Sequence, residues 1–205
     1  MDAMHMAEGI RARLSAEGRV IREVAGYQRA AVLLLLCPSP EGPVLLLTVR
    51  TEEVETHKGQ ISFPGGIVDA GDRDAVHTAL REAEEEIGMR EEDLVVAGLL
   101  DDHVTPTGFV ITPVVAVCRR SPDLLPNPRE VAEVLHVPLW FFADPGAVRT
   151  EERIVRGERR PVHFYDYGRH VIWGATAAII REYLRRTSPD QDASASSSGL
   201  PSRSA

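Results

Sequence analysis

Runs of apolar and β-branched residues, broken by proline, glycine and polar residues, predict most of the strands of this chain. Runs of this kind occupy residues 30–36, 44–49, 60–63, 94–100 and 109–118. The proline-rich stretch at residues 38–43 separates the first two runs, so we expect them to form a hairpin. Another hairpin is predicted at residues 152–155 and 162–167.

Apolar residues spaced three or four apart predict helices at residues 6–16, 74–88 and 175–186. Asp74 is placed to cap the start of the second helix, and Gly88 to end it. A short helix is expected within residues 137–142, after Pro138. Because strands and helices follow one another in mixed order, without strict alternation, the predicted fold class is α+β.

Composition sets the domain organisation. Hydrophobic residues make up 43% of the 205 residues and charged residues 26%, which excludes a fibrous or wholly disordered protein. Residues 1–187 are expected to form one domain, long enough to bury a full hydrophobic core. Residues 188–205 are rich in Ser, Ala and Asp and have no apolar period, so we expect a disordered tail.

The charge and the apolar runs exclude several kinds of partner. The formal net charge is −8, so the chain lacks the basic surface of a general nucleic-acid binder. The longest apolar run, residues 30–37, is far shorter than the roughly 20 residues of a bilayer span, and no signal peptide precedes it. We therefore expect a cytoplasmic protein without a membrane or nucleic-acid partner, in which Cys37 and Cys118 are free, buried thiols.

The densest chemistry lies on the helix predicted at residues 74–88. At about 100° per residue, Glu82, Glu85 and Glu86 form one acidic patch beside the apolar stripe, while Glu84 lies on the other flank. Arg81 could pair with Glu85, which leaves the other two carboxylates uncompensated. Crowded carboxylates suit a hard divalent cation such as Mg²⁺; the alternative is an ordinary solvated helix face. The apolar stripe itself consists of Val76, Ala79, Leu80, Ala83 and Ile87.

Two glycines precede the acidic helix. Gly65 and Gly66 follow a predicted strand, and glycines let a ligand approach the backbone closely. A backbone carbonyl at this point, such as that of Gly66, could complete a metal shell. The alternative is that the two glycines form a tight turn.

At these residues the sequence resembles the Nudix hydrolases. The family motif is Gly, five residues, Glu, seven residues, then Arg-Glu-apolar-any-Glu-Glu-any-Gly-apolar, and residues 81–89 match its second half completely. The first half departs from the motif, because Asp72 stands in place of Glu and the following loop is one residue longer. We expect Arg81 to orient the acidic loop through Asp72.

Within that family the chain resembles the coenzyme A pyrophosphatases. Residues 57–66, His-Lys-Gly-Gln-Ile-Ser-Phe-Pro-Gly-Gly, fit the additional signature of that subfamily, and the similarity extends over about residues 30–186. Two positions differ: Thr51 stands where Ser or Ala is preferred, and Glu55 where the signature has Arg.

The resemblance implies a fold and an activity. The fold is the Nudix fold, a mixed central sheet packed between helices as an α/β/α sandwich. The activity is cleavage of the pyrophosphate bond of coenzyme A, with Mg²⁺ or Mn²⁺, to 3′,5′-ADP and 4′-phosphopantetheine. The metal would be held by Glu82, Glu85, Glu86 and Gly66. Substrate contacts would come from Arg50, His57, Lys58 and Gly65, although each of the three basic residues could equally be a surface base. Homodimers occur in the family.

The sequence leaves the substrate and the general base open. The substrate could be another nucleoside diphosphate derivative such as ADP-ribose, or the chain could be a sensor that binds a nucleotide without cleaving it. Glu130 and Glu133 are candidates for the general base outside the motif.

Asp101, Asp102 and His103 are interpreted as a loop cap. Trp140 and Trp173 are expected in the core.

Overall fold

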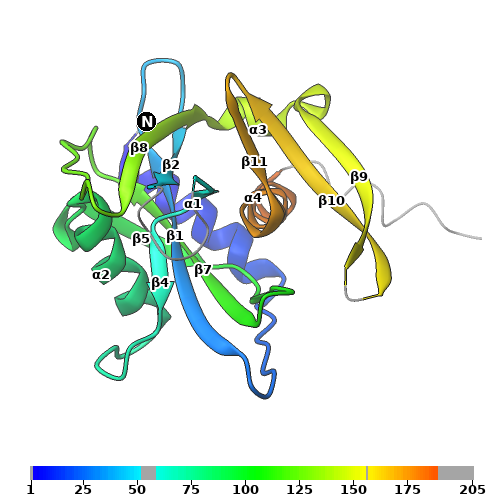
Figure 1. The fold of residues 1–205 in the computed structure, drawn as a ribbon. Coiled ribbons are helices and arrows are strands. Elements are labelled where there is room, and N and C mark those ends of the chain that lie inside the picture. The colour runs from blue at the N-terminus through cyan, green and yellow to red at the C-terminus, as the bar shows by residue number, and fades with distance from the viewer. Residues whose placement is uncertain (1, 52–58, 156, 189–205) are drawn as a thin grey trace, which may run out of the picture.

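The computed structural model describes residues 2–51, 59–155 and 157–188, whose strands form two sheets (Figure 1). In the larger sheet the order is β3-β2-β1-β7-β5, while β4 pairs with β1, β6 with β7 and β8 with β2. Strands β1 and β7 run parallel, whereas β1 and β2 form the expected antiparallel hairpin, so the sheet is mixed. Its strands are β1 (Gln28–Cys37), β2 (Val44–Arg50), β3 (Ile61–Ser62), β4 (Gly65–Ile67), β5 (Leu94–Leu99), β6 (His103–Val104), β7 (Phe109–Cys118) and β8 (Val131–Pro138).

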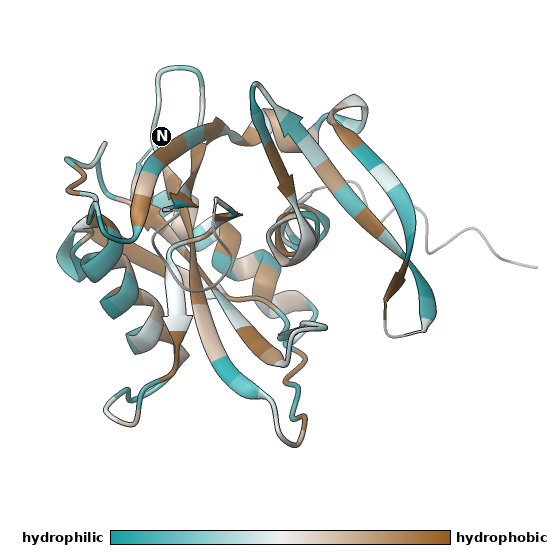
Figure 2. Ribbon diagram, in the orientation of Figure 1, coloured by the Kyte–Doolittle hydropathy of each residue, from teal (hydrophilic) through white to brown (hydrophobic). Residues whose placement is uncertain are grey.

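Helix α2 (Ala75–Ile87) covers one face of this sheet. Its residues Ala79, Ala83 and Ile87 are buried in one hydrophobic cluster with Leu33 and Leu35 of β1. The side of the helix that faces away from the sheet is hydrophilic (Figure 2). The amphipathic pattern therefore sets which face of α2 meets the sheet and which remains in water.

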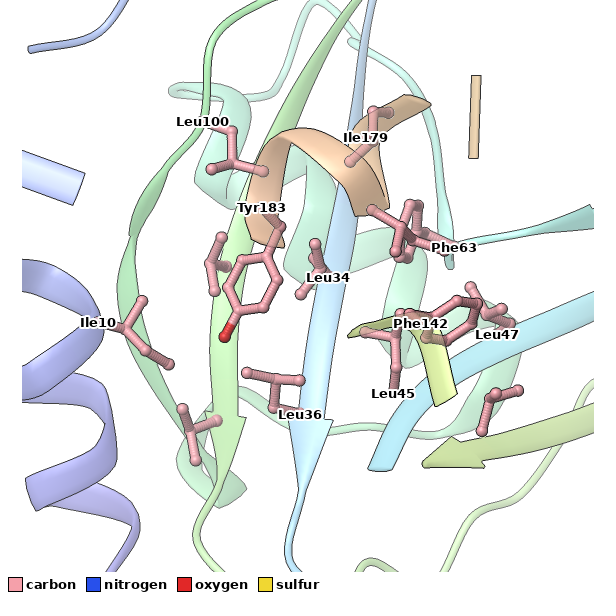
Figure 3. Packing of buried hydrophobic residues seen from close by; sticks show 14 of the residues in the cluster. Ile10, Leu34, Leu36, Leu45, Leu47, Phe63, Leu100, Phe142, Ile179 and Tyr183 are labelled. Atoms are coloured by element: carbon pink, nitrogen blue, oxygen red, sulfur yellow. The ribbon is translucent and has the colours of Figure 1, made fainter. Parts of the chain in front are cut away.

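Helices α1 (Ala3–Ala16) and α4 (Gly174–Thr187) cover the opposite face. Ile10 of α1 and Tyr183 of α4 share a second hydrophobic cluster with Leu34 and Leu36 of β1 (Figure 3). Because β1 is buried on both faces, its sequence is a continuous apolar run without alternation. The α/β/α arrangement confirms the expected fold class.

The smaller sheet has the order β11-β10-β9 and lies beyond α4 (Figure 1). The hairpin expected at residues 152–155 and 162–167 is present, with longer strands. The Thr176 hydroxyl at the start of α4 donates a hydrogen bond to the Ile61 carbonyl at 3.0 Å, which joins α4 to β3. The remaining elements are η1 (Glu91–Asp93), α3 (Leu139–Ala143), η2 (Pro145–Ala147), β9 (Val148–Val155), β10 (Glu158–Tyr167) and β11 (His170–Trp173).

Several expectations were wrong. The apolar pattern predicts no strand at β4, β6, β8 or β11, and Val137 lies in β8. The short helix expected after Pro138 is present as α3, which begins at Leu139. Trp140 and Trp173 are 59% and 42% exposed. The exposed Trp173 ring stacks on the Phe164 ring of the smaller sheet, so it covers a sheet face and does not fill the core.

The two cysteines are joined, contrary to the expectation of free thiols. Cys37 and Cys118 form a disulfide, with a sequence separation of 81. They come together because Leu36 pairs with Val117 in the parallel β1–β7 ladder, which places both strand ends side by side. Sequence spacing alone does not reveal that pairing.

Among the described residues no helix is long and apolar enough to cross a membrane. Of the tail expected at residues 188–205, residues 189–205 lie outside the described part of the chain.

Candidate functional site

Helix α2 places the acidic patch. The Asp74 side chain accepts a hydrogen bond from the His77 amide, and Gly88 ends the helix in the left-handed conformation, as predicted for both residues. Because these two caps fix the helix register, the carboxylates lie beside the buried face as the sequence suggests. Glu86 is buried, Glu82 is partly buried, and Glu84 and Glu85 are exposed.

Glu86 is the most unusual group of the site. It is only 3% exposed, and its Oε1 lies 3.7 Å from Nη1 of Arg50, at the end of β2. Its Oε2 is buried and has no hydrogen-bond partner among the described residues. Loss of water raises the pKa of Glu86 to about 8; Arg50 and the Gly65 amide oppose this rise, and the charges of Glu82 and Glu130 add to it.

Glu82 lies against the glycine pair. A Cβ placed on Gly66 would come within 2.5 Å of Cδ of Glu82, so the carboxylate occupies the space that a side chain would need. Burial raises the pKa of Glu82, and the Arg81 guanidinium opposes the rise. The surroundings of Glu82 and Glu86 therefore disfavour the charged form of both carboxylates.

Arg81 connects the acidic helix to the loop before it. Its Nε and Nη2 donate to the two oxygens of Asp72, each at 3.1 Å, which confirms the contact that the sequence suggests. This fork-to-fork pair holds the pKa of Asp72 well below its usual range. Nη1 of Arg81 contacts Glu82 at 2.9 Å and Glu85 at 3.2 Å. Asp72, which stands where the family motif has Glu, therefore contacts Arg81 from a loop that is one residue longer.

The expectation that Glu82 and Glu86 lack partners was wrong. Arg81 reaches Glu82 as well as Glu85, because the guanidinium lies between the two side chains. Glu86 faces Arg50, which is remote in sequence and is brought in by the pairing of β2 in the central sheet.

Of the expected substrate contacts, Arg50 and Gly65 are thus next to the acidic patch. His57 and Lys58, and also Glu55, lie outside the described residues.

A further carboxylate comes from the chain before β8. Glu130 is close enough to raise the pKa of both Glu82 and Glu86 by its charge. Its Oε1 accepts a hydrogen bond from Nδ2 of Asn127 at 3.0 Å, a residue that sequence reasoning missed. Glu133, the other candidate base, pairs instead with Arg169 at 2.7 Å.

The residues fit a divalent cation. The side chains around Glu86 supply carboxylate oxygens, which Mg²⁺ and Mn²⁺ prefer, and the orphaned Oε2 of Glu86 lacks a positive partner. Within the described ranges, no three His, Cys, Asp or Glu side chains are grouped so that they could hold a metal ion as they are placed. The guanidinium of Arg81, bound to Glu82 and Glu85, neutralises part of the charge.

The second acidic cluster is structural. Asp102 is 6% exposed and accepts hydrogen bonds from Arg19, Arg29 and Thr112. Asp101 accepts from the Val20 amide at 2.9 Å. These bonds tie the segment after α1 to the β5–β6 connection, in keeping with a loop cap.

Comparison with known proteins agrees with this geometry. Residues 26–156 match the model of the NUDIX domain. The chain is 39% identical over 159 residues to a Photorhabdus laumondii protein named "Uncharacterized Nudix hydrolase NudL", covering 78% of this chain and 84% of the relative. It is 36% identical to Nudix hydrolase 15, mitochondrial, of Arabidopsis thaliana, with 75% of this chain and 56% of the relative covered.

A solved structure supports the fold. The MutT/nudix family protein from Enterococcus faecalis superimposes with a TM-score of 0.51 at 16% identity, covering 91% of this chain and 74% of that one. The family model spans more than half of the chain and includes the acidic helix. The chain belongs to the Nudix hydrolase family.

Proposed function

We propose that this Nudix hydrolase cleaves the pyrophosphate bond of coenzyme A, with Mg²⁺ or Mn²⁺, to 3′,5′-ADP and 4′-phosphopantetheine. The observation that carries the hydrolase chemistry is the buried Glu86 carboxylate, whose Oε2 has no partner within the described residues. Burying a charged group without a partner costs several kcal/mol, so a site of this kind is stabilised by a cation. The observation that favours coenzyme A is the match of residues 57–66 to the subfamily signature.

Each residue of the site has a role in this proposal. Glu82, Glu85 and Glu86 would hold the cation, together with the Gly66 carbonyl. When bound, such a cation neutralises phosphate charge and lowers the pKa of an attacking water. Arg81 would keep Glu82 and Glu85 in place through its bond to Asp72.

The substrate phosphates need positive charge from the protein itself. Arg50 is 25% exposed at its side chain and lies 3.7 Å from Glu86, so its guanidinium can contact a phosphate beside the acidic patch. His57 and Lys58 are further proposed phosphate contacts, and Gly65 would let the substrate approach the backbone. This positive charge would bring a polyanionic substrate to a protein of net charge −8.

The test is product analysis. Coenzyme A is incubated with the protein and Mn²⁺ or Mg²⁺, and we expect 3′,5′-ADP and 4′-phosphopantetheine in equal amounts, with no reaction in EDTA. A parallel reaction with ADP-ribose tests the second candidate function, a hydrolase of another nucleoside diphosphate derivative. That candidate is favoured by one observation, the charge reversal at Glu55. Faster cleavage of ADP-ribose would overturn the coenzyme A assignment, and binding without cleavage of either compound would indicate a sensor.

A further inference from the structure

The connection between β7 and β8 is fixed to the last turn of α2. The Leu125 amide donates to the Ile87 carbonyl at 2.9 Å, and the Asn127 amide donates to the Glu86 carbonyl at 2.8 Å. Carbonyls in the last turn of a helix have no donor within the helix, so this loop supplies the missing donors. The backbone of Asn127 is therefore attached directly to Glu86.

The side chain of Asn127 extends this attachment to Glu130. Its Nδ2 donates to Oε1 of Glu130 at 3.0 Å, and its Oδ1 accepts from the Arg129 amide at 3.2 Å. The two contacts agree on the orientation of the amide, because only the NH₂ group can face a carboxylate and only the oxygen can face an N–H. An aspartate at position 127 would have the same shape but would place its negative charge against that of Glu130.

The other end of the loop is anchored to β2. The Thr51 amide donates to the Glu130 carbonyl at 3.0 Å, and the Thr51 hydroxyl donates to the Arg129 carbonyl at 2.9 Å. Thr51 follows Arg50, which faces Glu86. The backbone of Glu130 is thus fixed on two sides, and the bond from Asn127 restrains its side chain.

We propose that Asn127 is a positioning residue of the site: it holds the Glu130 carboxylate beside Glu82 and Glu86, from a backbone that is itself fixed at Glu86. This inference rests on the proposed function, since it assumes that the carboxylates bind a divalent cation. Glu130 is then a fourth carboxylate of the cation site, and Asn127 acts only through it. Groups that orient metal-binding residues in this way typically change metal affinity or activity by about 10- to 100-fold when removed.

The experiment is a double-mutant cycle on Mn²⁺ affinity, measured by calorimetry on the substrate-free protein. The four proteins are wild type, Asn127→Ala, Glu130→Gln and the double variant. We expect Asn127→Ala to weaken Mn²⁺ binding about 10-fold. In the Glu130→Gln background it should cause little further loss, because residues that act through one group are not additive. Asp123→Ala, in the same loop at an exposed position, is the control and should bind Mn²⁺ like wild type.

The outcomes separate this proposal from the proposed function. Unchanged Mn²⁺ affinity in Asn127→Ala, with or without a lower melting temperature, would overturn the positioning role, and so would equal weakening in both backgrounds. Wild-type protein that binds no Mn²⁺ would overturn both proposals. Mn²⁺ binding with the expected cycle, but without cleavage of coenzyme A, would leave Asn127 as the positioning residue and overturn only the assigned substrate.

Discussion

The Glu86 carboxylate is held where the protein alone solvates it poorly. It is buried, its nearest cationic group is 3.7 Å away, and two other carboxylates raise its pKa. A residue selected only for stability would be apolar at this place. A buried carboxyl group whose charged form the protein disfavours is therefore the clearest sign of function at the residue scale.

Glu86→Gln tests this directly. The change keeps the shape and removes the charge, so we expect kcat to fall at least about 100-fold, which is about 2.7 kcal/mol of activation free energy. The melting temperature should stay the same or rise, because a desolvated charge is removed. Glu84→Gln, at an exposed position on the same helix, is the control and should keep the wild-type rate. A near-wild-type rate for Glu86→Gln would exclude a cation-binding role.

The neighbouring glycines should respond differently to alanine. In Gly66→Ala the three atoms nearest to the new Cβ all belong to the Glu82 carboxylate, with Cδ at 2.5 Å, and a flexible side chain can move away. We expect a melting temperature within a few degrees of wild type and a fall in kcat of at least about 10-fold, as for other disturbed metal-site groups.

In Gly65→Ala the new Cβ meets backbone atoms. It would overlap the Ala31 carbonyl oxygen and lie 2.6 Å from the Val32 Cα, at a φ of +152°. Backbone strain of this kind costs about 1–3 kcal/mol by itself, so thermal unfolding should show a clear loss of stability. Equal melting temperatures for the Gly65 and Gly66 variants would contradict the close contact between Gly65 in β4 and the backbone of Ala31 in β1.

Helix geometry predicts only the local part of the site. The sequence names Arg50 as a substrate contact and Glu130 as a candidate base, but it does not predict that they meet the acidic patch. Helix geometry places Glu82, Glu85 and Glu86 together, and the contact of Arg81 with Asp72 follows from nearby residues. Arg50, Glu130 and Asn127 come from other strands and loops, and their approach depends on the register of β2 with β1 and β8. No pattern of residues in the sequence predicts that strand register.

At the scale of elements, prediction succeeded where periodicity was strong. Helix α2 has both predicted caps, and the long apolar strands β1 and β7 were found. Strand β3 lies within the run predicted at residues 60–63, whereas β4 and β6 are three and two residues long, too short to show a period. Strand β8 has buried Val131, Leu135 and Val137 among more exposed residues, a pattern too irregular to predict a strand.

The loop before α2 makes stability dependent on pH. The bonds from Arg81, the Asp69 amide and Thr78 hold the pKa of Asp72 below its ordinary value of 3.8, although burial opposes this. Because the folded pKa is lower than the unfolded one, the stabilisation is fully present above that ordinary value and is lost as the pH falls below it.

The measurement is the urea midpoint of wild type and Asp72→Asn between pH 6 and pH 3. We expect wild type to be more stable at pH 6, and the difference to shrink below about pH 4, where the unfolded carboxylate becomes protonated. The apolar contacts of α2 are unchanged in the variant. A difference that stayed constant over this range would mean that the charge of Asp72 contributes nothing.

At the scale of the whole molecule, contacts remote in sequence hold the layers together. The pairing of β1 with β7 and the Cys37–Cys118 disulfide both join distant segments. Composition predicts a core of this size, and the family resemblance predicts its architecture. The apolar pattern predicts neither the parallel pairing nor the packing of α1 and α4 on the same face.

Arg186 joins α1 to α4. Its side chain is 1% exposed and contacts Asp101 at 2.9 Å, and its Nη2 donates to the carbonyls of Leu14 and Gly18 at 2.5 and 2.8 Å. One guanidinium in α4 therefore donates hydrogen bonds to carbonyls at the C-terminal end of α1 and contacts Asp101 in the connection after β5.

Arg186→Met should destabilise the whole fold. The substitution keeps much of the apolar stem and leaves two carbonyls without their donor, which costs about 1–3 kcal/mol. Asp101, whose side chain is 28% exposed, keeps the Val20 amide as a donor. For a chain of this size the loss corresponds to a fall in melting temperature of roughly 2–12 °C. Arg185→Met is the matched control, because Arg185 pairs with Glu17 and Glu182 at the surface, where a pair contributes only about 0–1 kcal/mol. Similar melting temperatures for the two variants would show that the buried guanidinium does not hold α1 and α4 together.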